Sequence, residues 1–339
     1  YLGGMATSRI DGDGLYNVTY GLDSQLRLFG DEYLTVKWLQ TFQGGDGLRD
    51  AAPAGLDAAR VIVDWTRRNL EGLSYQNAFV WSGPGYDPAV GFESRSDFLR
   101  AQSDWNYQWY PDAQSSFRRI WAGVESNAWI RNEDDNVDTG QITPFLQLET
   151  KPGTSLKASI NGVYEDVVEP FALTEEVSIP EGSYWAPEAA LELRAARGWT
   201  VRPNVTLTAG RFFDGNRIGI ETDYNWAVGP HLELRGGWEW NRIRFPDRDQ
   251  AFDSHLARVQ AQTAIDSRFS INTFVQYNSL TDAVTTNARF RYNFREGQDL
   301  WLVWNEGLNL DRDAVLGVPR RPFEGARTLT VKYTHTFIF

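Results

Sequence analysis

Hydrophobic and polar residues alternate along most of the chain, in segments of about a dozen residues. Between residues 15 and 29, even positions such as Tyr16 and Leu22 are apolar, whereas odd positions such as Asn17 and Asp23 are polar. Successive side chains of a β-strand point to opposite faces of the sheet. The pattern therefore predicts strands with one apolar and one polar face. Their length suits a tilted strand that crosses a bilayer better than a soluble strand of about 5–6 residues.

The alternation predicts about eighteen strands, counting residues 1–9 as the partner that the strand at 15–29 needs. Segments 73–82 and 298–306 alternate poorly, and loss of one hairpin would leave sixteen strands. The predicted strands are 1–9, 15–29, 32–43, 58–70, 73–82, 98–110, 116–132, 139–150, 154–166, 184–196, 202–213, 216–227, 231–245, 254–265, 269–278, 283–294, 298–306 and 326–339.

The connections between these strands fall into two sets. Most on one side are short turns, such as 30–31 and 151–153. Most on the other are longer acidic or Gly/Pro-rich loops: 44–57, 83–97, 133–138, 167–183, 246–253 and 307–325. Short periplasmic turns and long extracellular loops are typical of outer-membrane barrels. We predict an all-β, transmembrane, antiparallel up-and-down barrel that fills residues 1–339 as one domain. The alternative, a soluble sandwich or propeller, would need much shorter strands.

The C-terminal segment carries a second indication of location. Phe339, Phe337 and Tyr333 share one face of the last strand, with His335 as the polar member of that face. A terminal strand of this kind resembles the signal that the barrel-assembly machinery of Gram-negative bacteria reads. We therefore predict an outer-membrane protein whose partners are that machinery, membrane lipid and lipopolysaccharide.

Composition agrees with this prediction. The sequence contains 14 Trp, 14 Tyr and 19 Phe, which suits aromatic girdles at two membrane interfaces, and it has no Cys. A formal charge of −12 argues against a nucleic-acid partner. The first residues lack the basic start and apolar core of a signal peptide. We expect the chain to be a mature product or a fragment.

Six segments, spread over nearly the whole chain, carry a resemblance to a known family. They are YLGGMATSR (1–9), YGLDSQLRLFGDEY (20–33), GYDPAVGFESRSDFLR (85–100), IPEGSYW (179–185), AGRFFDGNR (209–217) and RYNFREGQDLWLVWNEG (291–307). Together they resemble a C-terminal barrel-like domain of unknown function that typically follows a carbohydrate-binding-family-9-like domain in Gram-negative envelope proteins. The resemblance implies an outer-membrane barrel whose usual N-terminal sugar-binding-like domain lies outside this chain. It implies no reaction and no catalytic residue.

The polar face of the strands is the first candidate site. If the apolar face meets lipid, the polar face lines a lumen, and a barrel of this size is wide enough for an aqueous channel. Charges of both signs give little net field, so strong ion selectivity is not predicted. The plainer interpretation is a wall of salt bridges. The predicted lumen residues are Asp23, Arg27, Lys37, Arg60, Asp64, Arg100, Asp104, Arg119, Glu125, Glu149, Lys157, Glu192, Arg194, Arg217, Glu221, Asp223, Glu233, Arg235, Glu239, Arg258, Arg289 and Arg291.

The loop at 83–97 is the second candidate, because porins often fold a loop inward as a constriction. Its Gly and Pro residues fix turns, and Tyr86, Phe92 and Arg95 are able to stack on or hydrogen-bond to sugar. The alternative is an ordinary packed surface loop. Acidic runs such as 133–135 lack the spacing of a calcium loop, so no metal site is predicted.

The predicted function is a passive or gated conduit for small hydrophilic solutes, oligosaccharides among them. The alternative is a plugged anchor for a periplasmic domain or a partner subunit at the N-terminus. No enzymatic activity and no cofactor are predicted, because His231, His255 and His335 form no triad in the sequence and no nucleotide or haem motif is present.

Overall fold

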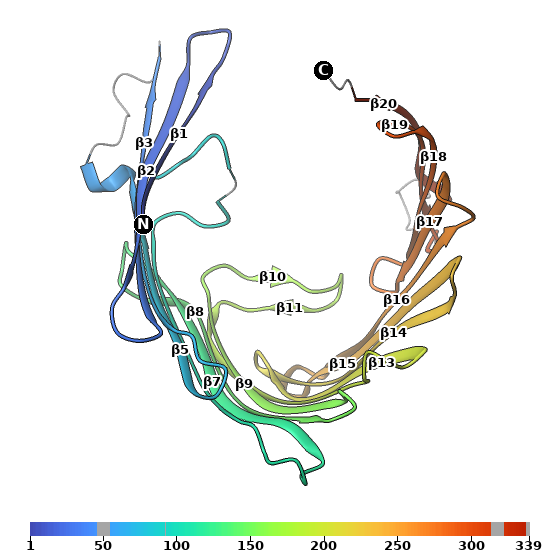
Figure 1. Cartoon of the computed structure of the whole chain (residues 1–339), viewed down its shortest axis with the longest axis horizontal. Helices are drawn as coiled ribbons and strands as arrows, with labels where there is room; N and C mark the ends of the chain where they lie inside the picture. The colour runs from blue at the N-terminus through green and yellow to red at the C-terminus, as the bar shows by residue number, and fades with distance from the viewer. Residues whose placement is uncertain (46–54, 92, 313–321, 337–339) are drawn as a thin grey trace. The chain divides into compact units, whose positions relative to one another are not determined.

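The computed structural model describes residues 1–45, 55–91, 93–312 and 322–336. These residues form twenty β-strands and two short 3-10 helices (Figure 1). Eighteen strands belong to one antiparallel sheet, and β10 and β11 form a separate two-stranded sheet. The eighteen-strand prediction is confirmed, and the sixteen-strand alternative is wrong because both poorly alternating segments are strands.

The chain consists of two compact units. Unit 1 contains Tyr1–Leu148, Ser159–Phe171 and Ile179–Glu188, and unit 2 contains Glu149–Ala158, Ala172–Ser178 and Ala189–Phe339. The first strands are β1 (Leu2–Ile10), β2 (Tyr16–Arg27), β3 (Glu32–Gly44), β4 (Ala59–Arg67), β5 (Gly72–Ser82), β6 (Phe98–Trp109), β7 (Phe117–Arg131), β8 (Val137–Thr150) and β9 (Ser155–Val167).

The remaining elements follow in the same up-and-down order. They are β10 (Phe171–Ala172), β11 (Ser178–Ile179), β12 (Gly182–Arg194), β13 (Val201–Phe212), β14 (Gly215–Gly229), β15 (Leu232–Phe245), β16 (Gln250–Ala264), β17 (Phe269–Asn278), β18 (Ala283–Arg295), β19 (Gln298–Asn309) and β20 (Glu324–His335), with 3-10 helices η1 (Gly55–Ala58) and η2 (Pro246–Arg248).

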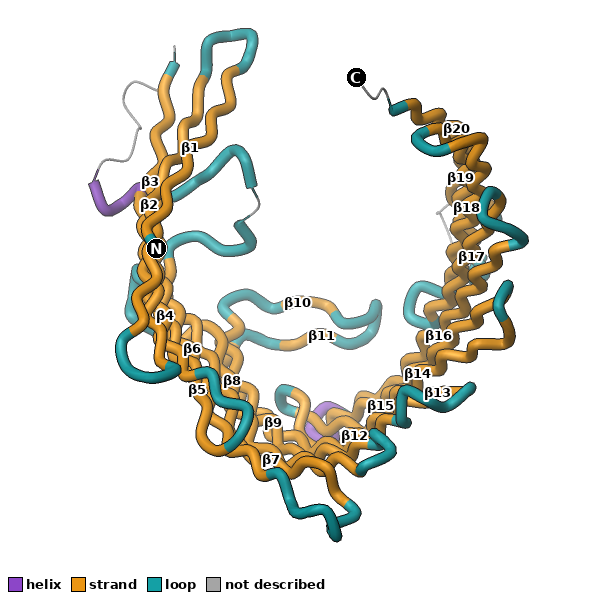
Figure 2. The backbone as a smooth tube through the Cα atoms, in the orientation of Figure 1, coloured by secondary structure: helices purple, strands orange, loops and turns teal. Residues whose placement is uncertain are grey.

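Each strand pairs with its neighbour in the sequence in a register that keeps apolar residues on one face. Leu22 of β2 lies opposite Trp38 of β3, and the next pair, Asp23 with Lys37, lies on the other face. In unit 2, β13 to β20 pair in the same way, strand by strand (Figure 2). The period-2 alternation of the sequence therefore produces one apolar and one polar face in each unit.

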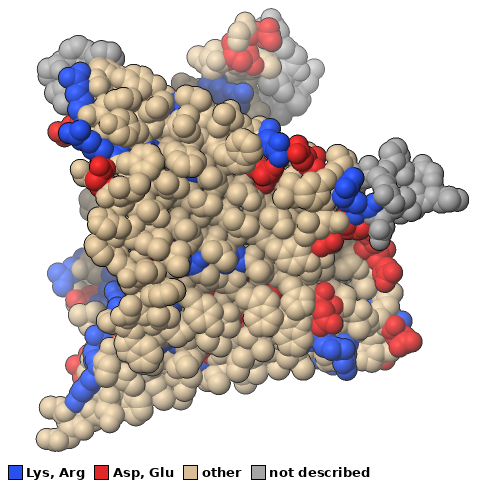
Figure 3. All heavy atoms as spheres, turned by 90° about the vertical axis from the view of Figure 1, so that its right-hand side faces the viewer, with Lys and Arg blue, Asp and Glu red and all other residues tan. Residues whose placement is uncertain are grey.

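The apolar face is the exposed one. Leu329 and Val331 are 63% and 62% exposed, and aromatic residues such as Phe294 are also exposed. Figure 3 shows a broad uncharged band on the side where β17 to β20 lie, with most charged side chains at its edges. Soluble proteins rarely expose so large an apolar surface, whereas a membrane-facing sheet requires it.

Most of the buried apolar side chains lie on the polar face or beneath loops, whereas Tyr75 is buried between Trp65 and Trp105 of the apolar face. Phe98 and Tyr86 are buried in unit 1, and Ile243 and Phe245 are buried in unit 2. By register, Phe98, Ile243 and Phe245 alternate with the outward apolar residues. The packed clusters of the chain are therefore small and sit against the polar face.

In each unit, tight turns join the strands at one end, which we call the turn end of that unit. The opposite end, with connections such as 83–97 in unit 1 and 246–249 in unit 2, is the loop end of that unit. Gly30 has φ of 47°, a left-handed conformation that glycine adopts without steric cost, and Arg27 Nε donates to its carbonyl at 2.5 Å. At the turn 265–268, the Asp266 carboxylate accepts the backbone N–H groups of Arg268 and Phe269, which lowers its pKa.

Three connections differ from their predicted form. The predicted loop 167–183 contains the β10–β11 pair, because Val177 and Ile179 supply a short alternating segment. The predicted loop 246–253 is shorter, because η2 turns the chain at once and β16 already starts at Gln250. The strand predicted at 58–70 ends at Arg67. In the described part of the chain, no helix has the length and apolarity needed to cross a membrane.

Candidate functional site

The register places the charged residues that were predicted to line a lumen on one face of the sheet, opposite the apolar side chains. In unit 1, Asp104 lies opposite Glu125, and Thr35 lies opposite Asp64. In unit 2, Glu221 lies opposite Glu239. The residues on this face are Asp23, Arg27, Lys37, Arg60, Asp64, Arg119 and Glu125 in unit 1, and Arg217, Glu221, Asp223, Glu233, Arg235, Glu239, Arg289 and Arg291 in unit 2.

In unit 1, the loop 83–97 is hydrogen-bonded to side chains on the polar face of β2 and β3. Asn17 Nδ2 donates to the carbonyl of Asp87 at 2.7 Å, and the Ala89 N–H donates back to Asn17 Oδ1 at 3.1 Å. Gln43, which lies opposite Asn17 in the register, donates to the Asp87 carboxylate at 3.0 Å. The loop therefore folds over this face of the sheet instead of extending away from it.

A second set of contacts fixes the same loop to β4 and β6. The Arg60 guanidinium lies 2.5 Å from the Glu93 carboxylate, and it faces the rings of Tyr86 and Phe98 at 5.9 and 5.7 Å. Tyr86 is only 5% exposed. Burial raises the pKa of its phenol, and the Glu93 carboxylate raises it further, while Arg60 opposes the shift.

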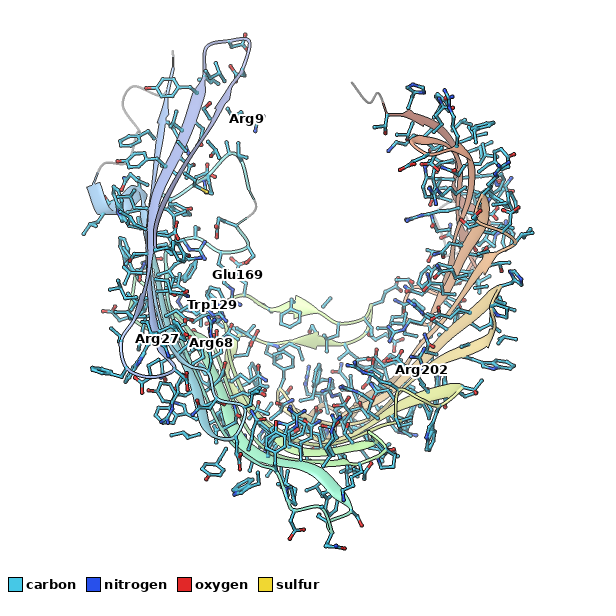
Figure 4. All side chains as sticks on the ribbon, viewed as in Figure 1. Arg9, Arg27, Arg68, Trp129, Glu169 and Arg202 are labelled. Atoms are coloured by element: carbon cyan, nitrogen blue, oxygen red, sulfur yellow. The ribbon has the colours of Figure 1, made fainter. Side chains whose placement is uncertain are left out.

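The far end of the loop reaches β7 and β8. Arg95 pairs with Asp138 at 2.6 Å and donates to Thr139 at 3.1 Å. Its guanidinium faces the ring of Trp129 at 4.7 Å, and Arg100 of β6 faces the same ring at 5.1 Å. Figure 4 labels Trp129 in unit 1. The alternation of β7 puts this tryptophan on the polar face, which simple hydrophobicity would not predict.

Two of the three loop residues proposed to meet sugar are thus held by the protein itself. Tyr86 is buried, and Arg95 is engaged by Asp138 and Trp129. Phe92 lies outside the described residues. In this arrangement Tyr86 and Arg95 fix the position of the loop. Of the predicted assembly signal, Tyr333 is 56% exposed on the apolar face, and Phe337 and Phe339 lie outside the described residues.

Beside this loop, the connection 132–136 carries an ion-pair network. Arg131 bonds to Asp134 at 3.0 Å, to Asp166 at 2.8 Å and to Asp138 at 3.4 Å. The Arg131 guanidinium and the Asn136 amide hold the pKa of Asp134 well below its usual range. The acidic run of the sequence is thus tied to an arginine. Within the described residues, no three His, Asp or Glu side chains come together as metal ligands would.

The polar face of unit 2 carries a ladder of alternating charges. Arg258 bonds to Asp223 at 3.0 Å and to Glu221 at 3.2 Å. On β15, the strand between β14 and β16, Arg235 bonds to Glu233 at 3.0 Å. These pairs are between one-third and one-half exposed, so their attraction is screened by solvent and stabilises the sheet only slightly.

The ladder borders a pocket of about 360 Å³ on β13 to β17. Arg202 and Asn204 of β13 lie in its wall, and Phe274 of β17 closes it on the other side. The Nε of Arg202 and the Oδ1 of Asn204 are buried and have no hydrogen-bond partner within the described residues. Figure 4 labels Arg202 in this unit. Because unpaired buried polar atoms are costly, these two atoms favour a polar occupant.

A second pocket of about 650 Å³ adjoins the first, since Gln260 and Phe274 line both. Its wall is rich in amide and hydroxyl groups from β17 to β20. Arg289 also lines it and has no hydrogen bond or ion pair within the described part of the chain. The polar groups of the wall are Asn272, Thr285, Asn287, Arg289, Asn305 and Thr328. A wall of this kind is able to bond with hydroxyl-bearing solutes.

Sequence reasoning missed one feature of unit 2: the tip of the β10–β11 segment is anchored near η2. Arg248 donates to the carbonyl of Ser178 at 2.5 Å and to Asp214 at 2.9 Å, and Gln250 donates to the carbonyl of Glu176 at 3.1 Å. The alternation of Val177 and Ile179 within a long loop was the available signal.

The three histidines lie in three different surroundings. His255 stacks on Trp238 with ring centroids 6.1 Å apart on the apolar face, and His231 contacts the carbonyl of Ala264 at the turn end. His335 contacts the amide of Gln298 at 2.8 Å. The absence of enzymatic activity remains a prediction.

Comparisons with known proteins find similarity in structure only. No family model and no curated protein sequence matches the chain. The solved structure of the ferric enterobactin receptor PfeA, in complex with BCV-L6, is 9% identical, with a TM-score of 0.53 over 90% of this chain. This chain spans 62% of the length of that receptor. OmpT, an outer membrane protein of Vibrio cholerae in its trimer form, is 12% identical over 98% of this chain and 97% of its own, with a TM-score of 0.41.

The likeness to the receptor structure concerns the fold alone. It agrees with the antiparallel sheet, the exposed apolar face and the two classes of connection described above. The chain has the fold of the outer-membrane β-barrels, and this fold supports an outer-membrane location.

Proposed function

We propose that the chain is an outer-membrane conduit of a Gram-negative bacterium for small hydrophilic solutes, with neutral oligosaccharides as the favoured class. The observation that carries the proposal is the polar face of unit 2, where two adjoining pockets keep polar groups available. Some wall groups bond to one another, as Asn287 does to Asn305 and Gln260 to Asn272, but Arg202 Nε and Asn204 Oδ1 have no partner within the described residues. Unpaired polar atoms are costly when solvent is excluded. The available groups indicate a face that works in contact with water and solute.

The chemistry of the larger pocket favours a neutral, hydroxyl-rich solute. Asn272, Asn287 and Asn305 each offer a donor and an acceptor, and Thr285 and Thr328 offer hydroxyls. Phe274 provides an apolar ring beside them. In and beside the neighbouring ladder, Arg202, Arg235 and Arg258 balance three carboxylates, those of Glu221, Asp223 and Glu233. The site therefore has little net field to select cations or anions.

In this proposal the loop 83–97 is a fixed constriction. The contacts made by Asn17, Arg60 and Arg95 hold it at three places against the polar face of unit 1. A loop held in this way narrows a path without opening and closing. Selection then comes from the radius of the path and from the donors that line it, so the conduit is passive.

Single-channel recordings of the purified chain in planar bilayers test the proposal. Discrete conductance steps that a neutral oligosaccharide reduces are the expected result. The double variant Asn287→Leu with Asn305→Leu should keep the steps and lose most of the reduction, because it removes amide groups without changing the loop. A matched double variant on the apolar face, Phe290→Leu with Leu302→Phe, should behave as the unaltered chain does.

Folded protein that shows no conductance would contradict the conduit. That outcome would favour the second role expected from the sequence, a plugged anchor for a periplasmic domain or partner subunit. Folding is checked by heat-dependent migration in electrophoresis. Conductance measured on one preparation of folded protein therefore distinguishes the conduit from the anchor.

A further inference from the structure

Three arginines gather at the loop end of β13, β14 and β15, on the apolar face of unit 2. Arg211 of β13 lies opposite Asn216 of β14, and Asn216 lies opposite Arg244 of β15. Arg242 precedes Arg244 by two residues and so shares its face. All three side chains are exposed. We call Arg211, Arg242 and Arg244 the arginine patch.

The arginine patch is not neutralised by the protein. None of its guanidinium groups has a hydrogen bond or an ion pair within the described residues. The one acidic residue directly opposite is Asp253, which faces Arg242 across β15 and β16, and its carboxylate accepts Trp240 Nε1 at 3.2 Å. Arg327, by contrast, lies on the same face of β20 and is paired with Glu306 and Glu324. The patch therefore keeps an excess of positive charge, whereas Arg327 on the same face is compensated.

The surroundings of the patch point to an amphiphilic occupant. Leu207, Ile218 and Trp238, which follow it toward the middle of the same strands, are 45%, 56% and 40% exposed. Adjacent strands lie about 4.8 Å apart, so the Cα atoms of Arg211 and Arg244 are separated by roughly 10 Å. Guanidinium groups at that spacing are able to hold phosphate oxygens in bidentate fashion. Acyl chains would lie along the apolar residues next to them.

We propose that Arg211, Arg242 and Arg244 bind the phosphate groups of a phosphorylated, acylated lipid in the outer leaflet, with its acyl chains on the neighbouring apolar face. The position of the patch at the loop end fits this leaflet, since long loops of such barrels are extracellular. The proposed site lies outside the sheet and is independent of any conduit on the polar face.

Native mass spectrometry of the purified, folded chain in detergent tests the site, with diphosphorylated lipid A as the probe. The triple variant Arg211→Gln, Arg242→Gln and Arg244→Gln should bind the probe at least about tenfold more weakly, because each charged hydrogen bond contributes appreciably to binding. The matched control is Arg27→Gln, Arg68→Gln and Arg268→Gln, which removes three exposed charges at the turn ends of the two units and should leave binding unchanged.

Two further measurements distinguish the source of the phosphate. Dephosphorylated lipid A should bind weakly to the unaltered chain and equally weakly to the triple variant, whereas inorganic phosphate should not displace the diphosphorylated probe at equal concentration. Equal binding of that probe by the unaltered chain and the triple variant would overturn the proposal, as would effective displacement by inorganic phosphate. A second variant, Asp253→Asn, tests the site without relying on the folding of the triple variant. It removes the carboxylate nearest the patch, so it should tighten binding of the diphosphorylated probe.

Discussion

The polar faces of the two units arise from the same alternation, yet they differ in how their polar groups are used. In unit 1, the face near the loop end is covered by the loop 83–97, and its Asn17, Arg60 and Arg95 contacts leave Tyr86 buried. In unit 2, the face around Gln260 keeps two pockets of about 360 and 650 Å³. One face is filled by the chain itself, and the other remains open to small molecules.

The difference shows how the length of a connection affects the hydrogen bonding of the strand residues next to it. A long loop brings its own carbonyls, carboxylate and aromatic ring to the wall, so the wall residues find partners within the protein. The short connections 213–214 and 279–282 supply few such groups, and polar atoms such as Arg202 Nε and Asn204 Oδ1 have no hydrogen-bond partner within the described residues. The same residue types therefore hold the loop in unit 1, and in the proposed function they face solute in unit 2.

The largest contrast is expected from two glycine substitutions. In Gly83→Ala the new Cβ would meet the backbone carbonyls of Leu56, at 2.7 Å, and Asp57, whereas in Gly237→Ala it would meet the flexible side chains of Arg258 and Asp223. Backbone cannot move aside as side chains can, so Gly83→Ala should lower the free energy of unfolding by about 2–3 kcal/mol and Gly237→Ala by less than about 1. Urea unfolding in detergent measures both, and equal losses would remove the distinction between a filled and an open face.

The next effect separates the two arginine clusters. Arg60→Gln leaves the Glu93 carboxylate without its partner in a mostly buried place, so it should lower the free energy of unfolding by about 2 kcal/mol. Arg258→Gln removes pairs that are more exposed and should cost below about 1 kcal/mol. Proteolysis within 83–97 should accelerate only in Arg60→Gln. A larger loss for Arg258→Gln would reverse the comparison.

A smaller effect is expected from the hydrogen bonds that join the loop 83–97 to β2. Asn17→Ala removes the two hydrogen bonds to Asp87 and Ala89 and should cost about 1–2 kcal/mol of loop stability. Hydrogen exchange at the Ala89 amide is the direct measurement and should accelerate by one order of magnitude or more. Asn106→Ala, on β6, serves as the control and should leave that amide unchanged.

The smallest effect depends on pH. Because Arg131 and Asn136 hold the pKa of Asp134 below its usual range, the folded state favours the carboxylate. Its stabilisation is present above the ordinary pKa of about 4 and is lost as the pH falls through the lowered pKa of the folded state. Asp134→Asn should therefore lower the unfolding midpoint at pH 7, and the gap to the unaltered chain should narrow below about pH 4. A gap that stays constant with pH would contradict the assigned cause.

Much of the fold follows from the period-2 pattern. Asp23, Lys37 and Asp64 could be assigned to the polar face because each alternates with apolar neighbours, and the turns at 30–31 and 151–153 carry glycine or proline where the chain reverses. The same rule worked for the poorly alternating strands β5 and β19, because pairing with regular neighbours fixes their register.

The candidate site was harder to predict because it depends on contacts that the pattern does not encode. The burial of Tyr86 needs Arg60 and Glu93 to meet across 33 residues, and Trp129 on the polar face needs Arg95 and Arg100 beside it. The tip at 172–178 likewise depends on Arg248, which is 70 residues from Ser178. Local alternation assigns a face to each strand residue, but it does not indicate which loop folds back or what it contacts.

Cysteine accessibility in single channels tests the central claim most directly, because the chain contains no Cys of its own. Asn305→Cys places a thiol on the polar face at the larger pocket, and Leu302→Cys places one on the apolar face of the same strand. A charged, membrane-impermeant thiol reagent should lower the current through Asn305→Cys and leave the current through Leu302→Cys unchanged. An unchanged current through a fully labelled Asn305→Cys would contradict the claim that this polar face lines a path for solutes.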